Sequence, residues 1–182
     1  MRTRRITHCC TVIAAVIVGA WLSAAPALAA DTPDAWITMK TKIALMTADD
    51  VSTSDLNVDT VNGVVTLHGK VPTEAEKSKA ERTASKIDGV KSVKNLLQIV
   101  PAARREVVER ADDEVKGAIE SAFKANQRVK DSGIKVASVN KGVVLLAGTA
   151  SSLEAHLEAV QVAYAVKGVR RVSSEVVVSS NT

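Results

Sequence analysis

Few side chains in this sequence are of the types that carry out catalysis, and those few stand far apart. Beyond residue 30 the chain has two histidines, His68 and His156, and no cysteine. Neither histidine has a second ligand or a nucleophile at the spacing of a metal site or a catalytic triad. We therefore expect two ordinary, partly exposed histidines, no bound metal ion and no cofactor.

Pairs of adjacent charged residues are no better candidates for catalysis. The acidic pairs are Asp49-Asp50 and Asp112-Asp113. Adjacent side chains point apart on a helix or strand, so neither pair can serve one substrate as acid and base, and both suit loops or helix ends. The basic pairs, Arg104-Arg105 and Arg170-Arg171, fit a solvated surface better than an anion site. These residues predict a protein that is not an enzyme.

The glycines are also structural in this interpretation. They stand singly, whereas a phosphate-binding loop gathers several within a few residues. We expect six of them at turns: Gly63, Gly69, Gly89, Gly142, Gly148 and Gly168.

The first 30 residues have the pattern of an export signal. Three arginines lie within the first five residues, an apolar stretch runs from 11 to 22, and Ala27-Leu28-Ala29 is typical of a cleavage site. We expect cleavage after Ala29 or Ala30. An uncleaved membrane anchor is the alternative, which Pro26 and the neighbouring small residues disfavour.

Removing this segment changes what the charge implies. The whole chain has 24 Lys and Arg against 20 Asp and Glu, but three arginines lie in the segment, which leaves 21 against 20. A basic excess of one does not indicate nucleic-acid binding. Both cysteines are in the same segment, so the exported part has no disulfide and must be stabilised by packing alone.

The elements that position these residues occur twice. Residues in the first half recur 78 positions later up to a turn and 79 positions later beyond it; examples are Asp34 with Asp112, Leu56 with Ile134, Thr60 with Ser138, Gly63 with Gly142, and Gly89 with Gly168. The offset changes where Asn62-Gly63 becomes Asn140-Lys141-Gly142. We expect the added residue to lengthen a hairpin loop from two residues to three. The chain is thus a tandem duplication.

Each copy is predicted to have the order helix, strand, strand, helix, strand. In the first copy, residues 31–101, Thr32 and Pro33 begin a helix that runs to about Met46. The predicted strands are 56–61, 64–70 and 93–100, and a second helix opens at Pro72-Thr73 and stops at Gly89. In the second copy, residues 102–182, the strands are 134–139, 143–149 and 169–178, with a helix over 151–166. The fold class is α+β, with two helices on one face of each three-stranded mixed sheet.

The junction between the copies is predicted to be helical. Apolar residues keep helical spacing from about Ala103 to Phe123, and no Gly/Ser linker follows Pro101. We interpret this as one long helix that enters the second unit, with residues 102–111 as a helical linker. A break near Asp112-Asp113 is the alternative.

The repeated unit resembles the BON domain, named for bacterial osmotically inducible periplasmic and nodulation proteins. The resemblance rests on Asp34, the run from Val61 to Gly69, Gly89-Val90, and their counterparts in the second copy, from Gly142 to Gly148 and Gly168-Val169. It implies a periplasmic envelope protein without catalytic activity, of the osmotic-stress type. Such proteins are thought to associate with phospholipid membranes or to assist other envelope proteins.

The first helix carries the main candidate contact surface. Its shared apolar positions recur in the second copy, but a further stripe of Trp36, Met39, Ile43 and Met46 becomes Glu114, Gly117, Ser121 and Lys124 there. At about 100° per residue this stripe points nearly opposite the shared face. Lys40 and Lys42 flank it, as in helices that lie on an anionic membrane surface.

Three interpretations of the protein stay open: it contacts anionic phospholipid, or it is a chaperone-like factor that binds exposed apolar segments of other envelope proteins, or it is a scaffold whose second domain recognises an assembly partner. The stripe itself contacts a membrane or a partner, or it packs against the second unit or a second copy in weak self-association.

Overall fold

The computed structural model describes residues 33–179. The predicted export signal, its cleavage site and Thr32 lie outside the described residues.

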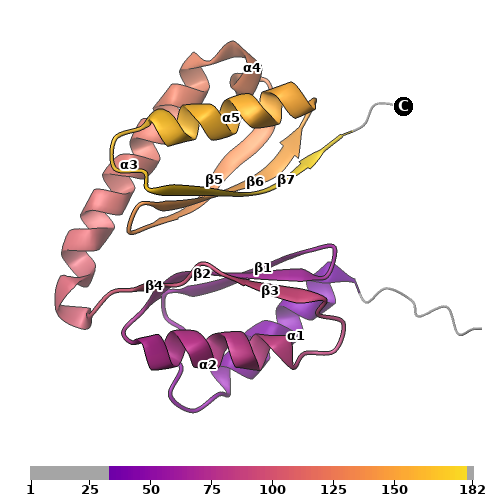
Figure 1. Ribbon diagram of the computed structural model, residues 1–182, viewed down its shortest axis with the longest axis vertical. Helices are drawn as coiled ribbons and strands as arrows, with labels where there is room; N and C mark the ends of the chain where they lie inside the picture. The colour runs from indigo at the N-terminus through magenta and orange to yellow at the C-terminus, as the bar shows by residue number, and fades with distance from the viewer. Residues whose placement is uncertain (1–32, 180–182) are drawn as a thin grey trace, which may run out of the picture. The chain divides into compact units, whose positions relative to one another are not determined.

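The first unit is a mixed sheet with two helices packed on one face (Figure 1). Strand β1 is antiparallel to β2, and β3 and β4 are both parallel to β2, as predicted. The helices begin close to the predicted residues, although Pro33 precedes the first helix instead of opening it. The elements are α1 (Asp34–Met46), β1 (Leu56–Val61), β2 (Val64–Val71), α2 (Glu74–Ser85), β3 (Ser92–Asn95) and β4 (Gln98–Ile99).

The predicted strand 93–100 is interrupted, so it forms two short strands in place of one. The Asn95 side chain explains the break, because its Oδ1 accepts a hydrogen bond from the Leu97 N–H at 3.2 Å. This bond takes a donor that a regular strand would give to its neighbour, and the Leu97 side chain is fully buried in the core.

The second unit repeats this architecture. Its first helix is continuous through Asp112-Asp113, as predicted, and follows one turn of 3₁₀ helix after Pro101. A short helix, α4, was not predicted. Strand β5 is antiparallel to β6, and β7 is parallel to β6. The elements are η1 (Ala102–Arg104), α3 (Arg105–Ala125), α4 (Gln127–Lys130), β5 (Gly133–Asn140), β6 (Val143–Ala150), α5 (Leu153–Ala165) and β7 (Arg171–Val178).

The two hairpins correct the prediction about the added residue. Both loops have two residues, Asn62-Gly63 and Lys141-Gly142, and all four have positive φ, as a type I′ turn requires. The extra residue of the second copy is instead absorbed inside β5, where the register shifts between Val136 and Ser138. A single added residue in one strand is a β-bulge.

The cores of the two units use the same positions. Val65, Leu67, Ala80 and Ala84 are fully buried in the first unit, and so are their counterparts in the second: Val144, Leu146, Ala159 and Ala163. The paired alanines let the second helix of each unit lie close against the middle strand. Thr73 and Ser152 begin these two helices, because each side-chain oxygen accepts the backbone N–H three residues later, at 3.2 Å.

Candidate functional site

The apolar stripe of α1 lies on the surface. Trp36, Met39, Ile43 and Met46 have exposed fractions of 48, 44, 54 and 72%, whereas Ile37, on the opposite side of the helix, is buried. The described residues of the second unit therefore do not cover the stripe. Soluble proteins seldom expose four large apolar side chains on one helix face, and such patches commonly mark interaction sites.

Two lysines border this stripe on either side. Helical geometry puts Lys40 and Lys42 roughly 80° from its centre, in opposite directions. The Lys40 ammonium lies 5.5 Å from the centre of the Trp36 ring and 4.0 Å from a carboxylate oxygen of Asp88, which is highly exposed. Lys42 is exposed. The exposed indole of Trp36 thus has a positively charged group beside it.

A second exposed apolar stripe occurs on α5, and the sequence analysis missed it. Leu153, Leu157 and Tyr164 are 57, 53 and 59% exposed. The first unit has Glu74, Ser78 and Ser85 at the corresponding positions. Comparing the second helices of the two copies, and not only the first helices, would have revealed it. Each unit therefore presents an apolar stripe on a different helix.

The aspartate at the start of each repeat holds the hairpin turn. The Asp34 carboxylate accepts hydrogen bonds from the N–H groups of Asn62 and Gly63, at 2.7 and 2.8 Å. Asp112 does the same for Lys141 and Gly142, at 3.0 and 3.2 Å. Asp112 therefore accepts these hydrogen bonds from the interior of α3. The sequence had predicted a loop or a helix end for the Asp112-Asp113 pair.

Asp112 has an additional partner from the first unit. The Lys70 ammonium lies 3.3 Å from its carboxylate, and the side chains of both residues are more than nine-tenths buried. Asp34 has no such partner among the described residues, and it is only partly buried. The second copy has thus kept the turn contact and added a buried charge pair.

The predicted glycines all have positive φ, but two of them are not at turns. Gly69 and Gly148 lie within β2 and β6. A side chain at Gly148 would collide with the backbone carbonyl of Gly133 in the adjacent strand. The close approach of the neighbouring backbone therefore explains why glycine occupies these two positions.

The prediction for His68 was wrong, because this residue is buried. Its Nε2 lies 2.8 Å from a carboxylate oxygen of Asp59 on the neighbouring strand. The hydrogen bond to His68 lowers the pKa of Asp59 below its ordinary value, against the opposing effect of burial. His156 is partly buried, and its Nε2 lies 2.7 Å from the hydroxyl of Ser174. Within residues 33–179, neither histidine has a hydrogen bond to a second side chain that would complete a catalytic triad.

Each unit also contains a surface pocket in the same place, between the end of the first helix, the following segment and the first strand. The pocket of the first unit has a volume of about 260 Å³, and that of the second about 300 Å³. Leu45, Leu56 and Val58 line the first, and Phe123, Ile134 and Val136 take their places in the second.

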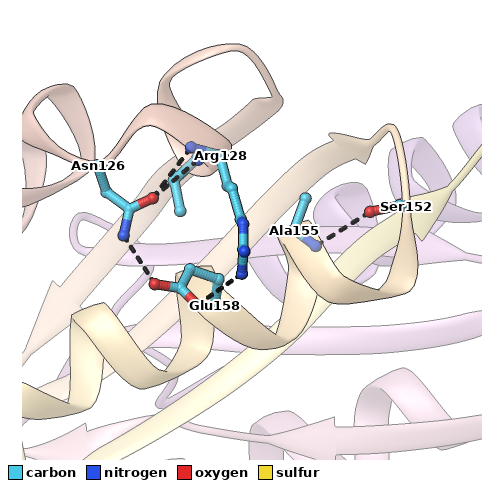
Figure 2. Close-up of polar contacts among 6 residues, drawn as sticks. Asn126, Arg128, Ser152, Ala155 and Glu158 are labelled. Carbon is cyan, nitrogen blue, oxygen red and sulfur yellow. Dashed lines mark hydrogen bonds and ion pairs between the residues drawn. The ribbon is translucent and has the colours of Figure 1, made fainter.

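Polar contacts fix one wall of the second pocket. Figure 2 shows the side chain of Asn126 between α4 and α5: its Oδ1 accepts the N–H groups of Arg128 and Val129, and its Nδ2 donates to Glu158 at 2.8 Å. Arg128 also faces Glu158, at 3.9 Å. Because Asn126 caps α4 and joins it to α5, this wall is held in place.

Among residues 33–179, none of the helices is long and apolar enough to cross a membrane. Within the same residues, no three His, Cys, Asp or Glu side chains gather as a group that could hold a metal ion.

The chain is similar to osmotically-inducible protein Y of Escherichia coli (strain K12), with 34% identity over 143 residues, which cover 78% of this chain and 71% of that protein.

Two solved structures are more distant. One is the C-terminal domain of CdsD, the structural protein of the type III secretion system of Chlamydia trachomatis, with 16% identity and a TM-score of 0.32 over 81% of this chain and 68% of that chain. Another CdsD structure has 13% identity and a TM-score of 0.33 over 69% and 86%. Both TM-scores are too low for either structure to support a conclusion about this chain.

The family match is more direct than either structure. The model of the BON domain matches residues 33–101 and again residues 111–180, so that both units are accounted for. The chain belongs to the BON-domain family.

Proposed function

We propose that this protein is a non-catalytic periplasmic envelope protein that associates with anionic phospholipid surfaces through α1, in an osmotic or envelope stress role. The exposed stripe with its flanking lysines is the observation that carries the proposal. The similarity to an osmotically inducible protein supports the stress role, and the pattern of residues 1–30 supports export.

The chemistry of α1 fits such a surface. An interfacial helix buries an apolar face at the boundary between headgroups and acyl chains while its lysines meet the anionic headgroups. An indole is favoured at this depth because its ring is apolar and its N–H is polar. Trp36, with Lys40 beside its ring, combines these features on one helix.

Trp36 fluorescence tests the proposal directly. In a chain that lacks residues 1–30, Trp36 is the only tryptophan. Its emission should shift to the blue on adding phosphatidylglycerol vesicles, less so at high salt, and little with phosphatidylcholine vesicles. Trp36→Glu should abolish vesicle cosedimentation while circular dichroism stays unchanged.

Leu157→Glu is the matched control, because it places the same charge on an equally exposed apolar stripe of the other unit. It should leave vesicle binding intact. An emission that is already blue in the free protein and does not move with lipid would place Trp36 in a protein contact, and the membrane proposal for α1 would be wrong.

A second candidate function rests on the α5 stripe. From Leu153 to Val166 there is no lysine or arginine, whereas Glu154 and Glu158 are acidic. This composition disfavours an anionic membrane and favours another envelope protein, as in a chaperone-like factor or scaffold. If so, Leu157→Glu should lose protection of an aggregating client protein, and Trp36→Glu should keep it.

A further inference from the structure

The pocket of the second unit combines an apolar floor with a basic rim. Phe123, Val129, Ile134 and Val136 form the floor, and all four are buried. Around the mouth are three exposed lysines, from three different elements, and one acid; these are Lys124 of α3, Lys130 of α4, Lys135 of β5, and Glu120.

None of the three lysine ammonium groups makes a hydrogen bond or ion pair within residues 33–179. Three cations that share one mouth repel each other, and a single acid cannot neutralise them. An anion at the mouth would relieve this repulsion.

The equivalent pocket of the first unit shows that this rim is not a requirement of the fold. Met46 and Asn57 stand there at the positions of Lys124 and Lys135. The position of Glu120 is taken by Lys42. The floor is apolar in both, so the hollow belongs to the repeated architecture, and the cluster of three lysines belongs to the second copy alone.

Backbone groups beside the pocket are already in use. The first N–H groups of α4 donate to Asn126 (Figure 2), and the Ser132 hydroxyl donates to the Val129 carbonyl and accepts the Ile134 N–H. An anion would therefore be held by flexible lysine side chains. Such contacts place a charge near the mouth without fixing its orientation, which suits a headgroup on a chain better than a peptide end held by backbone groups.

We propose that this pocket binds a single-chain anionic amphiphile of the fatty-acid type, with its hydrocarbon chain on the apolar floor and its carboxylate among Lys124, Lys130 and Lys135. A volume of about 300 Å³ is at the lower end for small-molecule sites, which suits one short or medium chain and leaves no room for the two chains of a phospholipid. The site does not involve α1 and does not depend on the proposed function.

Isothermal titration calorimetry with decanoate, kept below its micelle concentration, tests the site. The purified protein should bind one decanoate per chain, and decylammonium, with a chain of the same length, should not bind. Lys124→Gln/Lys135→Gln should weaken decanoate binding on the order of tenfold, because each exposed ion pair contributes a few-fold. Lys167→Gln, at an exposed lysine of the second unit that does not line the pocket, is the control and should bind normally.

The alternatives give different results. Equal binding of decanoate and decylammonium, or no effect of the lysine substitutions, would refute the role of the basic rim. Tighter binding of a short peptide that ends in leucine would make the occupant a protein C-terminus, and the proposal would be wrong. Loss of decanoate binding in Trp36→Glu alone would assign the amphiphile to α1. Circular dichroism of each variant verifies that the fold is intact.

Discussion

Replacing Asp112 by asparagine should destabilise the protein far more than the same change at Asp34. Both carboxylates accept two N–H groups of a hairpin turn, and only Asp112 also faces the buried Lys70 ammonium. The two substitutions are chemically identical, so the difference between them measures the contact with Lys70 together with the deeper burial of Asp112.

The magnitudes follow from the geometry. At 3.3 Å and an effective dielectric constant of about 20, the attraction of Lys70 and Asp112 is about 5 kcal/mol before desolvation is subtracted. Removing one partner of a buried pair leaves a charge without compensation and typically costs about 3–5 kcal/mol. Asp34→Asn loses charge-assisted hydrogen bonds at a more exposed site, which we expect to cost about 1–2 kcal/mol.

Urea unfolding and calorimetry of the two variants measure this difference. Asp112→Asn should lower the Tm by roughly 10 °C or more. Adding Lys70→Met removes the unpaired charge and should recover on the order of 1–2 kcal/mol. If the two asparagine variants lose equal stability, or if Lys70→Met gives no recovery, Lys70 does not pair with Asp112 in solution.

Two further substitutions test the backbone and the charged groups. Gly148→Ala, at φ +114° and against the Gly133 carbonyl, should cost at least about 2 kcal/mol, whereas Gly117→Ala, in a helix with open space around it, should gain up to about 1 kcal/mol in urea unfolding. A similar loss in both would contradict the strand-contact explanation. The lowered pKa of Asp59 means that its stabilising effect is present above its unfolded pKa, near 3.8, and is lost as the pH falls through the lower folded value. Thermal unfolding of Asp59→Asn should therefore depend less on pH in that acidic range than unfolding of the unchanged protein, and an identical pH profile would contradict the Asp59–His68 contact.

Most of the fold could be predicted from the sequence, because periodicity and turn residues are local signals. Asn62-Gly63 located the first hairpin to the residue, and the alanines at 80 and 84 located the buried face of α2. The place of the added residue could not be predicted from the sequence, because a longer loop and a β-bulge both shift the repeat offset by one residue. Only the register of β5 shows that the extra residue is in the strand and that Ser138 occupies the place of Asp59, not of Thr60.

The contacts that define sites were harder to predict, since they join residues that are distant in sequence. His68 contacts Asp59 on the neighbouring strand of the hairpin, and that contact depends on strand register. Helical geometry and the polar residues of the second copy separated the α1 stripe from the buried face, but only the structure shows that the described residues of the second unit leave the stripe exposed. The basic pocket did not, because its lysines come from three separate elements that only the fold brings together.

The link between aspartate and turn also bears on where this fold tolerates insertions. In each copy a helix side chain holds both N–H groups of a two-residue loop, so a third loop residue would pull at least one donor away from its acceptor. The second copy carries its additional residue three positions upstream of Asn140, within an outer strand, and its turn is unchanged. Loops usually vary in length at the hairpin tip. Here the two copies differ in length within the body of the strand instead.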